Sequence, residues 1–421
     1  MMVGLVGMTY ATGIGALGFE LLYLAATVIL LATVGYRIWE LSRSYKWIAS
    51  SQMLGDLYGS RALALATALV YLFAMIPYLA AQIQGLKAMF NYGGLGEAEA
   101  ITISAILVYL WIFIVGMWRV AITDTYQGFL MLAGGISYLI WALLYLVPAS
   151  GVTHAEIFNA LTERGHLGLT AFWSHTTFLA YTIPWAFFAV TNPQVVVRLY
   201  VPRDEKTFKK SVTAFYIYGF LYTVIVVLVG LVAAGLAIRG VIPRDMAWDS
   251  VTPHLLRLMH PLLGSLIAIT IIAAAVSTAN SIILAVSGGV ISLTREKSLV
   301  LARTIDAVLV VASTLLALTG IGFIVELSVL TSVILLPLAP ITILGVYRPG
   351  DKNTFTKISA LLSLTMGVSL ATHYAVTLGP RRAFREALLG LPLSAWVIII
   401  STIITVIGYV LGKLYTKTKS K

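Results

Sequence analysis

The sequence predicts an all-α protein that crosses a membrane many times. Hydrophobic residues make up 59% of the chain and charged residues only 11%, whereas a soluble domain carries about 25% charged residues. The apolar residues form continuous runs of the length that spans a hydrocarbon core, about 20 residues, and they do not alternate as barrel strands do. Because backbone groups in lipid must be hydrogen-bonded within the protein, we expect these runs to be helices.

Eleven apolar runs are predicted to be membrane spans, and loops with charged or polar residues separate them. In chain order the predicted spans are 18–37, 61–90, 98–118, 120–147, 171–190, 211–238, 261–292, 299–318, 323–346, 354–378 and 393–414.

The first 36 residues form one apolar stretch of unusual length. As a helix it would measure about 54 Å, at about 1.5 Å per residue, which is too long for one crossing and too short for two. Gly13, Gly15 and Gly18 are expected to break it and to leave a half-helix before the break. The charged amine of Met1 would then start near the bilayer centre, at a cost of several kcal/mol. We therefore expect either further residues before Met1 or a degenerate product.

The basic residues predict which loops face the cytoplasm. With the C-terminal tail 413–421 placed in the cytoplasm, alternation of the spans puts most of the 28 Lys and Arg residues on that side, as the positive-inside rule requires. The residues left outside are Lys87, Arg164, Arg239, Arg244, Arg257, Arg381, Arg382 and Arg385. The cluster 381–385 is the one misfit to this topology.

Charge and composition also exclude several classes of function. The net charge of +11 is spread between the apolar runs in ones and small clusters, which indicates topology signals rather than a nucleic-acid surface. The chain has no cysteine, so thiolate metal sites and disulfides are excluded. Neither a Walker loop nor a dinucleotide fingerprint occurs. We expect no enzyme activity and no organic cofactor, with membrane lipid and a small polar solute as partners and no nucleic acid.

The layout of the spans indicates a weak internal symmetry. The runs 61–90 and 261–292 are both unusually long, each follows a shorter span and a loop, and they lie about 200 residues apart. Inverted repeats of this kind occur in secondary transporters, which bind their solute near the bilayer midplane between the repeats.

Four motifs carry a resemblance to a known family. Residues 273–281 read AAAVSTANS and resemble the eighth core helix of the sodium:solute symporter family, the family of proline, pantothenate and sugar symporters. TDTYQ at 123–127 resembles the segment that opens the fifth core helix, and NPQVVVRLY at 192–200 resembles the cytoplasmic end of the sixth. GLVGMTYATG at 4–13 resembles the second half of the first.

This resemblance implies a fold, an activity and a location. The fold is the LeuT-like five-plus-five inverted repeat, with residues 1–147 as the first repeat, 171–346 as the second, and 354–421 as two accessory helices and a basic cytoplasmic tail. The first core helix is incomplete relative to the family. The implied activity is sodium-coupled symport of a small polar solute, an amino acid, vitamin, carboxylate or sugar, by alternating access across the cell membrane.

Two adjacent hydroxyl residues, Ser277 and Thr278, are the candidate sodium ligands. Na⁺ is a hard cation that takes oxygen ligands, and two neighbouring hydroxyls and a freed carbonyl can supply three of them. The family's second sodium site uses these two positions and the backbone carbonyl that matches Ala274; Asn280 stands where many members have Asp. The alternative is structural, because Ser and Thr in a helix also bond to a carbonyl one turn back.

Candidates for the solute site are polar or aromatic residues that interrupt the apolar runs, several of them close to Pro77 or Pro184. Such residues face a helix interface or a cavity, although packing alone also accounts for them. The candidates are Tyr78, Gln82, Trp185, Phe188, Asn192, Ser281 and Thr331.

Four ionisable residues approach the membrane, and residues of this kind are functional candidates by default. They are Glu20, Asp124, Asp306 and Glu326. Asp124 is interpreted as a topological pair with Arg119, and Asp306 as an (i, i+3) pair with Arg303. Glu326 lies near the outer end of its span and is expected to be solvated.

Two alternatives to sodium-coupled symport stay open. One is a transport-inactive or sensor-like homologue that keeps the fold but lacks a complete sodium site. The other is proton coupling, with Glu326 or another acid titrating in place of Na⁺. The solute itself is not predicted, because one scaffold serves many solutes.

Overall fold

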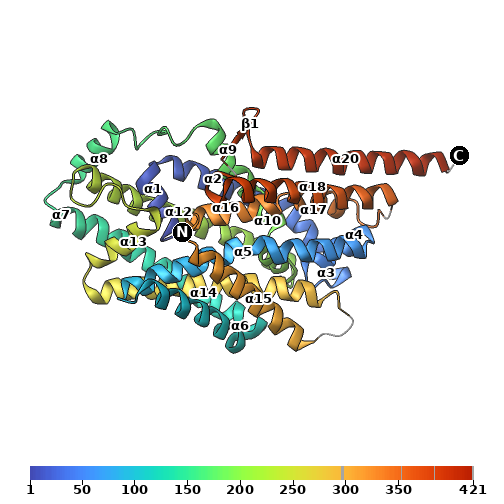
Figure 1. Ribbon diagram of the computed structural model, residues 1–421, viewed down its shortest axis with the longest axis horizontal. Helices are drawn as coiled ribbons and strands as arrows, with labels where there is room; N and C mark the ends of the chain where they lie inside the picture. The colour runs from blue at the N-terminus through green and yellow to red at the C-terminus, as the bar shows by residue number, and fades with distance from the viewer. Residues whose placement is uncertain (295–297, 352, 384, 420–421) are drawn as a thin grey trace.

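A computed structural model describes the part of the chain analysed below. It covers residues 1–294, 298–351, 353–383 and 385–419 and, within them, all side chains except those of 113–122, 380, 381 and 419. The all-α architecture is confirmed, with most helices running along the long axis of the molecule (Figure 1). Several basic side chains used for the topology lie outside this part, namely Arg119, Arg295, Lys297, Lys352, Arg381, Lys419 and Lys421.

The first third of the chain contains seven α-helices and two π-helical turns. They are α1 (Gly4–Thr12), α2 (Gly15–Leu30), η1 (Leu31–Gly35), α3 (Tyr36–Tyr45), α4 (Ser50–Tyr58), α5 (Arg61–Tyr92), α6 (Glu97–Trp141), η2 (Ala142–Leu146) and α7 (Val147–Ala149).

The rest of the described chain adds thirteen α-helices, one 3₁₀ turn and a two-stranded antiparallel hairpin. They are α8 (His154–Glu163), α9 (His175–Ala186), α10 (Phe188–Thr191), α11 (Pro193–Val196), η3 (Val197–Tyr200), α12 (Glu205–Ile238), α13 (Trp248–Arg257), α14 (Pro261–Ile291), α15 (Leu299–Leu318), α16 (Ile324–Leu335), α17 (Leu338–Tyr347), α18 (Thr354–Leu378), α19 (Pro380–Ala383), β1 (Ala387–Leu388), β2 (Leu391–Pro392) and α20 (Leu393–Lys419).

Side-chain caps define where four of the long helices begin. Ser60, Asp204, Ser298 and Asn353 each accept a hydrogen bond from a backbone N–H in the first turn of α5, α12, α15 and α18. A polar residue of this type satisfies one of the N–H groups that a helix start leaves without a partner. The polar loops between the apolar runs therefore fix the helix starts.

The predicted spans are confirmed for most of the chain. In the described ranges eight helices are long and apolar enough to cross a membrane, and the bent pair α16–α17 would make a ninth. The predicted span 171–190 is wrong as a single helix, since α9 has only 12 residues and ends before Phe187. The predicted spans 98–118 and 120–147 are not separated by a loop, because α6 runs through both.

α6 nevertheless contributes two antiparallel segments. As a straight rod its 45 residues would measure about 68 Å. Glu97 at its start pairs with Lys87 near the end of α5, whereas Asp124 contacts Ser277 in the middle of α14. Gly134 lies against Thr270, two turns nearer the start of α14. The start of α14 lies beside Tyr92 at the end of α5, and therefore at the same level of the bundle as Glu97. The segment from Asp124 to Gly134 runs back toward this level, so the chain reverses direction between Glu97 and Asp124.

α1 and α2 are separated at Gly13, as the glycines in this stretch predict. Gly13 has φ 74°, a left-handed conformation that glycine adopts without strain. The Thr12 carbonyl accepts hydrogen bonds of 3.0 Å from Thr170 Oγ1 and from Trp173 Nε1. The polar groups freed by this break are therefore satisfied by the segment before α9.

Two further breaks divide what would otherwise be single spans. Phe187 leaves the helical conformation between α9 and α10, and Asn192 is extended before Pro193, as a residue preceding proline usually is. α16 and α17 meet at an angle of 49°, where Pro337 cannot donate a backbone hydrogen bond.

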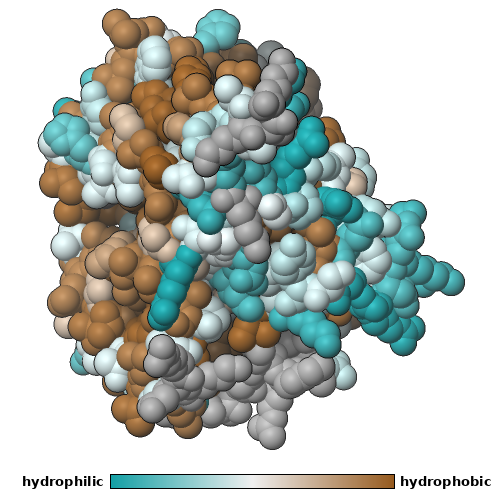
Figure 2. Space-filling view, turned by 90° about the vertical axis from the view of Figure 1, so that its right-hand side faces the viewer, coloured by the Kyte–Doolittle hydropathy of each residue, from teal (hydrophilic) through white to brown (hydrophobic). Residues whose placement is uncertain are grey.

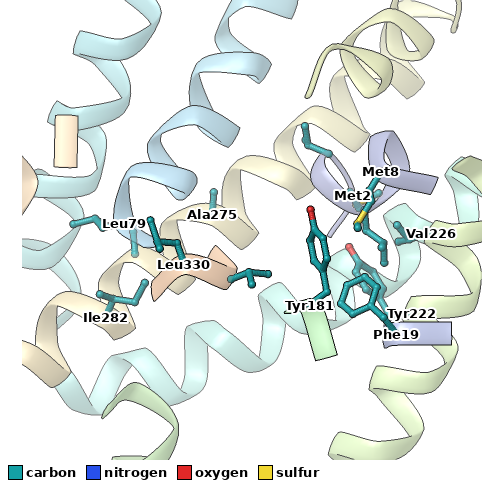
Figure 3. Packing of buried hydrophobic residues seen from close by; sticks show 14 of the residues in the cluster. Met2, Met8, Phe19, Leu79, Tyr181, Tyr222, Val226, Ala275, Ile282 and Leu330 are labelled. Atoms are coloured by element: carbon teal, nitrogen blue, oxygen red, sulfur yellow. The ribbon is translucent and has the colours of Figure 1, made fainter. Parts of the chain in front are cut away.

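The apolar core connects all of these segments. Figure 3 shows Leu79 of α5, Ala275 and Ile282 of α14 and Leu330 of α16 on one side of the view. On the other side lie Met2, just before α1, and Met8, Phe19, Tyr181, Tyr222 and Val226, from α1, α2, α9 and α12 (Figure 3). The short helix α1 is thus packed inside the bundle.

The C-terminal helices α18 and α20 pack along each other and lie side by side at one edge of the molecule (Figure 1). At Gly367 of α18 a Cβ atom would lie 2.4 Å from Pro337 Cγ and 2.7 Å from Ser401 Oγ. Only glycine permits so close an approach of α18 to the α16–α17 bend and to α20.

The two ends of the bundle carry different polar contacts. At the end that holds the C-terminus, Arg43 donates to the Arg203 carbonyl and Asn353 donates to the Gly412 carbonyl. Figure 2 views this end and shows hydrophilic residues gathered on it, next to hydrophobic flanks. At the opposite end Lys87 pairs with Glu97, and Arg239 pairs with Glu156.

We predict that these two ends face the two sides of the membrane. Cysteines introduced into this cysteine-free chain at Ser44 and Lys206 are expected to react only from the cytoplasm, and one at Ala155 only from outside, because all three side chains are exposed. The measurement is labelling of intact cells with an impermeant maleimide. Labelling of the 206 position in intact cells would contradict the topology.

Candidate ion and solute sites

One turn of α14 carries the predicted sodium ligands. The Thr278 hydroxyl donates to the Ala274 carbonyl at 2.9 Å, as in the structural alternative that the sequence left open. Ser277 behaves differently, because its hydroxyl donates to the carboxylate of Asp124 on α6. The three predicted oxygen ligands therefore lie on one turn of α14, and the structure adds a carboxylate beside one of them, the Ser277 hydroxyl.

Arg198, in the 3₁₀ turn η3, completes this cluster. Its Nη2 lies 2.7 Å from Asp124 Oδ2 and 2.7 Å from Ser281 Oγ, and Ser281 donates to the Ser277 carbonyl at 3.0 Å. The Arg198 side chain is 54% exposed, whereas that of Asp124 is 23% exposed. The carboxylate therefore lies inside the bundle, and its present partner reaches it from the solvent side.

Asp124 has two partners that the sequence interpretation did not name. The expected topological pair with Arg119 stays a prediction, because the Arg119 side chain lies outside the described residues; within them Asp124 binds Arg198 and Ser277. The two partners are 74 and 153 residues away in sequence, and local spacing cannot reveal such contacts. The signal that could have found them was Asp124 itself, an acid inside a motif that also resembles the family.

This cluster has the chemistry of a hard-cation site. Hydroxyls, a carbonyl and a carboxylate are oxygen ligands of the kind that hard cations take. The carboxylate also compensates the charge of a cation in a region of low dielectric. Ser281, predicted as a solute ligand, belongs to this cluster through Arg198 and Ser277.

A second cluster is aromatic and lies where α9 breaks. Trp185 and Phe188 stack with ring centroids 5.5 Å apart and an interplanar angle of 9°. Tyr23 of α2 meets Trp185 edge-on at 5.0 Å and Phe188 at 6.3 Å. The structure therefore brings two predicted solute residues together and adds Tyr23, which the sequence did not single out.

The other predicted solute residues surround the centre of the bundle at different places. Gln82 of α5 donates to the Tyr78 carbonyl one turn back at 3.3 Å. Asn192 is fully buried, and its amide oxygen accepts a hydrogen bond from Thr191. Thr331 is buried in α16, where its hydroxyl has no hydrogen-bond partner within the described residues.

The remaining acids of the spans have separate roles. Asp306 lies 3.6 Å from Arg303, so the predicted (i, i+3) pair is confirmed. Glu326 is only 1% exposed and lies 3.4 Å from Arg385, so the prediction that it is solvated is wrong. Arg385 belongs to the basic cluster 381–385, which did not fit the predicted topology. The buried Glu326 carboxylate and the Phe172 ring hold it in place, and this explains its position.

Glu97 and Lys87 form an ordinary surface ion pair at the end of the bundle opposite the C-terminus. Hydrogen bonds from Lys87 and Asn91 hold the pKa of the Glu97 carboxyl below its usual range. Glu97 therefore stays charged near neutral pH, and the charge of Lys87 is balanced.

The sequence of the chain matches the sequence model of one protein family. The model of the sodium:solute symporter family aligns with residues 1–347, which is most of the chain. The chain belongs to the sodium:solute symporter family. A curated relative is the sodium/pantothenate symporter of Haemophilus influenzae, 26% identical over 289 residues. That alignment covers 66% of this chain and 57% of the relative, so the chain matches little more than half of the relative's length.

Solved structures of transporters share the fold. A Na⁺-coupled sialic acid symporter in a substrate-bound, outward-open state has a TM-score of 0.76 at 17% identity, covering 97% of this chain and 86% of that one. The inward-facing structure of Mhp1 has a TM-score of 0.61 at 13% identity, covering 99% and 88%. The predicted LeuT-like architecture is thereby confirmed, and a family of transporters rather than enzymes is established.

We predict that the Glu326–Arg385 pair stabilises this family member. Replacing Arg385 with Met is expected to lower the free energy of unfolding by about 1–3 kcal/mol, because it leaves the buried Glu326 carboxylate without its ionic partner. The double variant R385M/E326Q is expected to regain much of this loss. Arg382→Met, in the same segment and exposed, is the matched control. Thermal unfolding in detergent measures the effect, and equal melting temperatures for R385M and R382M would contradict it.

Proposed function

We propose that the protein is a sodium-coupled symporter of a small polar organic solute. The observation that carries this proposal is the turn 274–278 of α14, where the Ser277 hydroxyl binds the Asp124 carboxylate and the Thr278 hydroxyl binds the Ala274 carbonyl. Membership of the family and the fold shared with a Na⁺-coupled symporter support it. Na⁺ would bind these oxygens, and the solute would bind near the aromatic cluster at the break between α9 and α10.

The placement of the breaks supports alternating access in this proposal. A helix that is already interrupted can change direction there without losing further backbone hydrogen bonds. The α9–α10 break and the 49° bend between α16 and α17 flank the centre of the bundle, so rocking about them would open it to either side. In this proposal residues 1–147 and 171–346 form the two inverted repeats, and the protein lies in the cell membrane with its C-terminus in the cytoplasm.

In this proposal the ion site has two states, one with Na⁺ and one in which the Arg198 guanidinium takes the place of Na⁺ beside Asp124. With the guanidinium 2.7 Å from Asp124, the carboxylate is neutralised by an internal cation. Na⁺ would take over this role when the Arg198 side chain withdraws to the water that it already partly reaches. Sodium binding and the Arg198–Asp124 contact are therefore mutually exclusive in this proposal.

Loss of either hydroxyl is predicted to weaken sodium binding. Ser277→Ala or Thr278→Ala removes one oxygen ligand, and a loss of roughly 1.4–3 kcal/mol corresponds to a roughly 10- to 150-fold lower sodium affinity. The measurement is ²²Na⁺ binding to the purified protein, titrated with NaCl at constant ionic strength. Thr365→Ala is the control, because Thr365 is exposed on α18 and its hydroxyl also bonds to a carbonyl one turn back. Unchanged affinity in both site variants would overturn the sodium assignment.

Loss of the internal cation is predicted to act in the opposite direction. Arg198→Gln is expected to raise the sodium affinity several-fold, because Na⁺ no longer competes with a guanidinium for Asp124. The same ²²Na⁺ titration tests this. A fall in affinity would show that Arg198 supports the ion site rather than competing for it.

Proton coupling is the second candidate, and the observation that favours it is Glu20. This carboxyl is 5% exposed and has one oxygen without a hydrogen-bond partner in the described part of the chain. If protons replaced Na⁺, uptake into liposomes would follow a pH gradient in sodium-free potassium buffer. The transport-inactive or sensor-like alternative, which lacks a complete sodium site, would give neither sodium binding nor uptake.

A further inference from the structure

A cavity with basic walls lies at the end of the bundle opposite the C-terminus, where Figure 1 places α8. Its volume is about 480 Å³, and it shares no lining residue with the α14 cluster or the aromatic cluster. Three parts of the chain line it: the end of α1, the segment that follows α8, and the end of α12 with the segment that follows it. The titratable side chains in its walls are Tyr10, Arg164, His166, Arg244 and Asp245.

Hydrogen bonds hold Arg244 in the wall formed by α12. Its Nε donates to the Ala237 carbonyl at 3.0 Å, and its Nη2 donates to the Ile238 carbonyl at 2.7 Å. The hydroxyl of Tyr10, at the end of α1, lies 2.6 Å from the carbonyl oxygens of Pro243 and Arg244. This wall is therefore fixed to both α1 and α12, while the Nη1 group of Arg244 forms no hydrogen bond within the described residues.

The wall formed by the segment after α8 is fixed to the break between α1 and α2. The His166 carbonyl accepts a hydrogen bond of 2.8 Å from the backbone N–H of Ile14, and the His166 ring Nδ1 lies 3.4 Å from the Arg164 carbonyl. The Arg164 side chain is exposed and forms no ion pair within 4 Å in the described ranges. Its guanidinium is therefore available to a ligand.

The charges of the cavity add up to a positive surplus. Arg164 and Arg244 bring two guanidinium groups and Asp245 brings one carboxylate, and within the described residues none of the three forms an ion pair. Glu156, an acid of α8, is paired with Arg239 and does not line the cavity. A cleft lined mainly by one sign of charge concentrates ions of the opposite sign, so we expect the ligand to be an anion.

The size of the cavity and the type of donor favour a phosphate ester among the anions. A guanidinium binds phosphate or carboxylate through two parallel N–H groups, which a halide ion cannot match. A volume of about 480 Å³ falls in the usual range of small-molecule sites, roughly 300–1,000 Å³, and exceeds what one inorganic ion fills. A phosphate monoester carries up to about two negative charges near neutral pH, one for each guanidinium.

We propose that this cavity binds the phosphate group of an ester between Arg164 and Arg244. A soluble phosphate ester and the headgroup of an anionic phospholipid share this chemistry. Because both walls are fixed to α1, the bound phosphate would join the segment before α9 to the segment after α12 and hold α1 in place between them. The site is separate from the ion and solute regions, so the proposal does not depend on the symport function.

The soluble source is tested with glycerol 3-phosphate, and glycerol is the uncharged control. Isothermal titration calorimetry of the full chain in detergent is expected to show binding of the ester at one site and none of glycerol. Arg164→Gln is expected to weaken this binding roughly 10-fold or more, because it removes a charged donor. Arg257→Gln is the matched control: Arg257 is exposed at the same end, with Nη2 3.5 Å from the Asn91 carbonyl, and does not line the cavity.

The lipid source is tested by native mass spectrometry of the full chain with phosphatidylglycerol or phosphatidylcholine added. If a headgroup occupies the cavity, the parent and R257Q retain phosphatidylglycerol in preference to phosphatidylcholine, and R164Q loses this preference. An effect of R164Q on the ester alone assigns the site to soluble esters, and an effect on the lipid alone assigns it to a headgroup.

Melting temperatures separate ligand binding from a structural role. Arg164→Gln is expected to leave the melting temperature of the ligand-free protein unchanged, whereas Arg244→Gln is expected to lower it, because two hydrogen bonds at the end of α12 are lost. R164Q therefore decides the question. The proposal is overturned if neither the ester nor phosphatidylglycerol binds the parent, or if R164Q binds both of them as the parent does.

Discussion

The need to satisfy every backbone polar group in lipid is the constraint on which this structure depends. A helix can break inside a bilayer only where other parts of the protein replace the lost hydrogen bonds. At Gly13 this replacement is visible, since the freed Thr12 carbonyl accepts from Thr170 and Trp173. The breaks at Phe187 and Pro337 also lie within the bundle. Irregular backbone, and with it any site built from carbonyl groups, is therefore confined to the interior.

Low dielectric imposes a similar constraint on charge. Three of the four acids that approach the membrane have an arginine partner: Asp124 with Arg198, Asp306 with Arg303, and Glu326 with Arg385. These pairs join different parts of the chain, because two of them link residues that are far apart in sequence. Glu20 departs from this pattern, since no arginine forms an ion pair with it within the described residues. Two of the three pairs thus hold segments of the bundle together by opposite charges.

The parts of this structure that depend on local sequence could be predicted, and the parts that depend on distant contacts could not. Apolar run length predicted the span 299–318 to the residue, and the glycines predicted the break at Gly13. The Ser277–Thr278 pair could be proposed from sequence because a motif carries it within one turn. Arg198 as a partner of Asp124 was missed and Glu326 was given the wrong environment, since Arg198 and Arg385 approach these acids only in the folded chain. Tyr23 was missed because an aromatic residue in an apolar run has no sequence signal until Trp185 and Phe188 lie beside it.

The close contact at Gly367 ties the outer edge of the molecule to the bend between α16 and α17. Because α18 touches Pro337 there and packs along α20, a change in the angle of the bend has to move both helices. α20 ends in the exposed basic tail with Lys413 and Lys417. In the proposed symporter, a spectroscopic probe attached to that tail would consequently report changes of the bend from outside the bundle, without a label in the proposed ion or solute region.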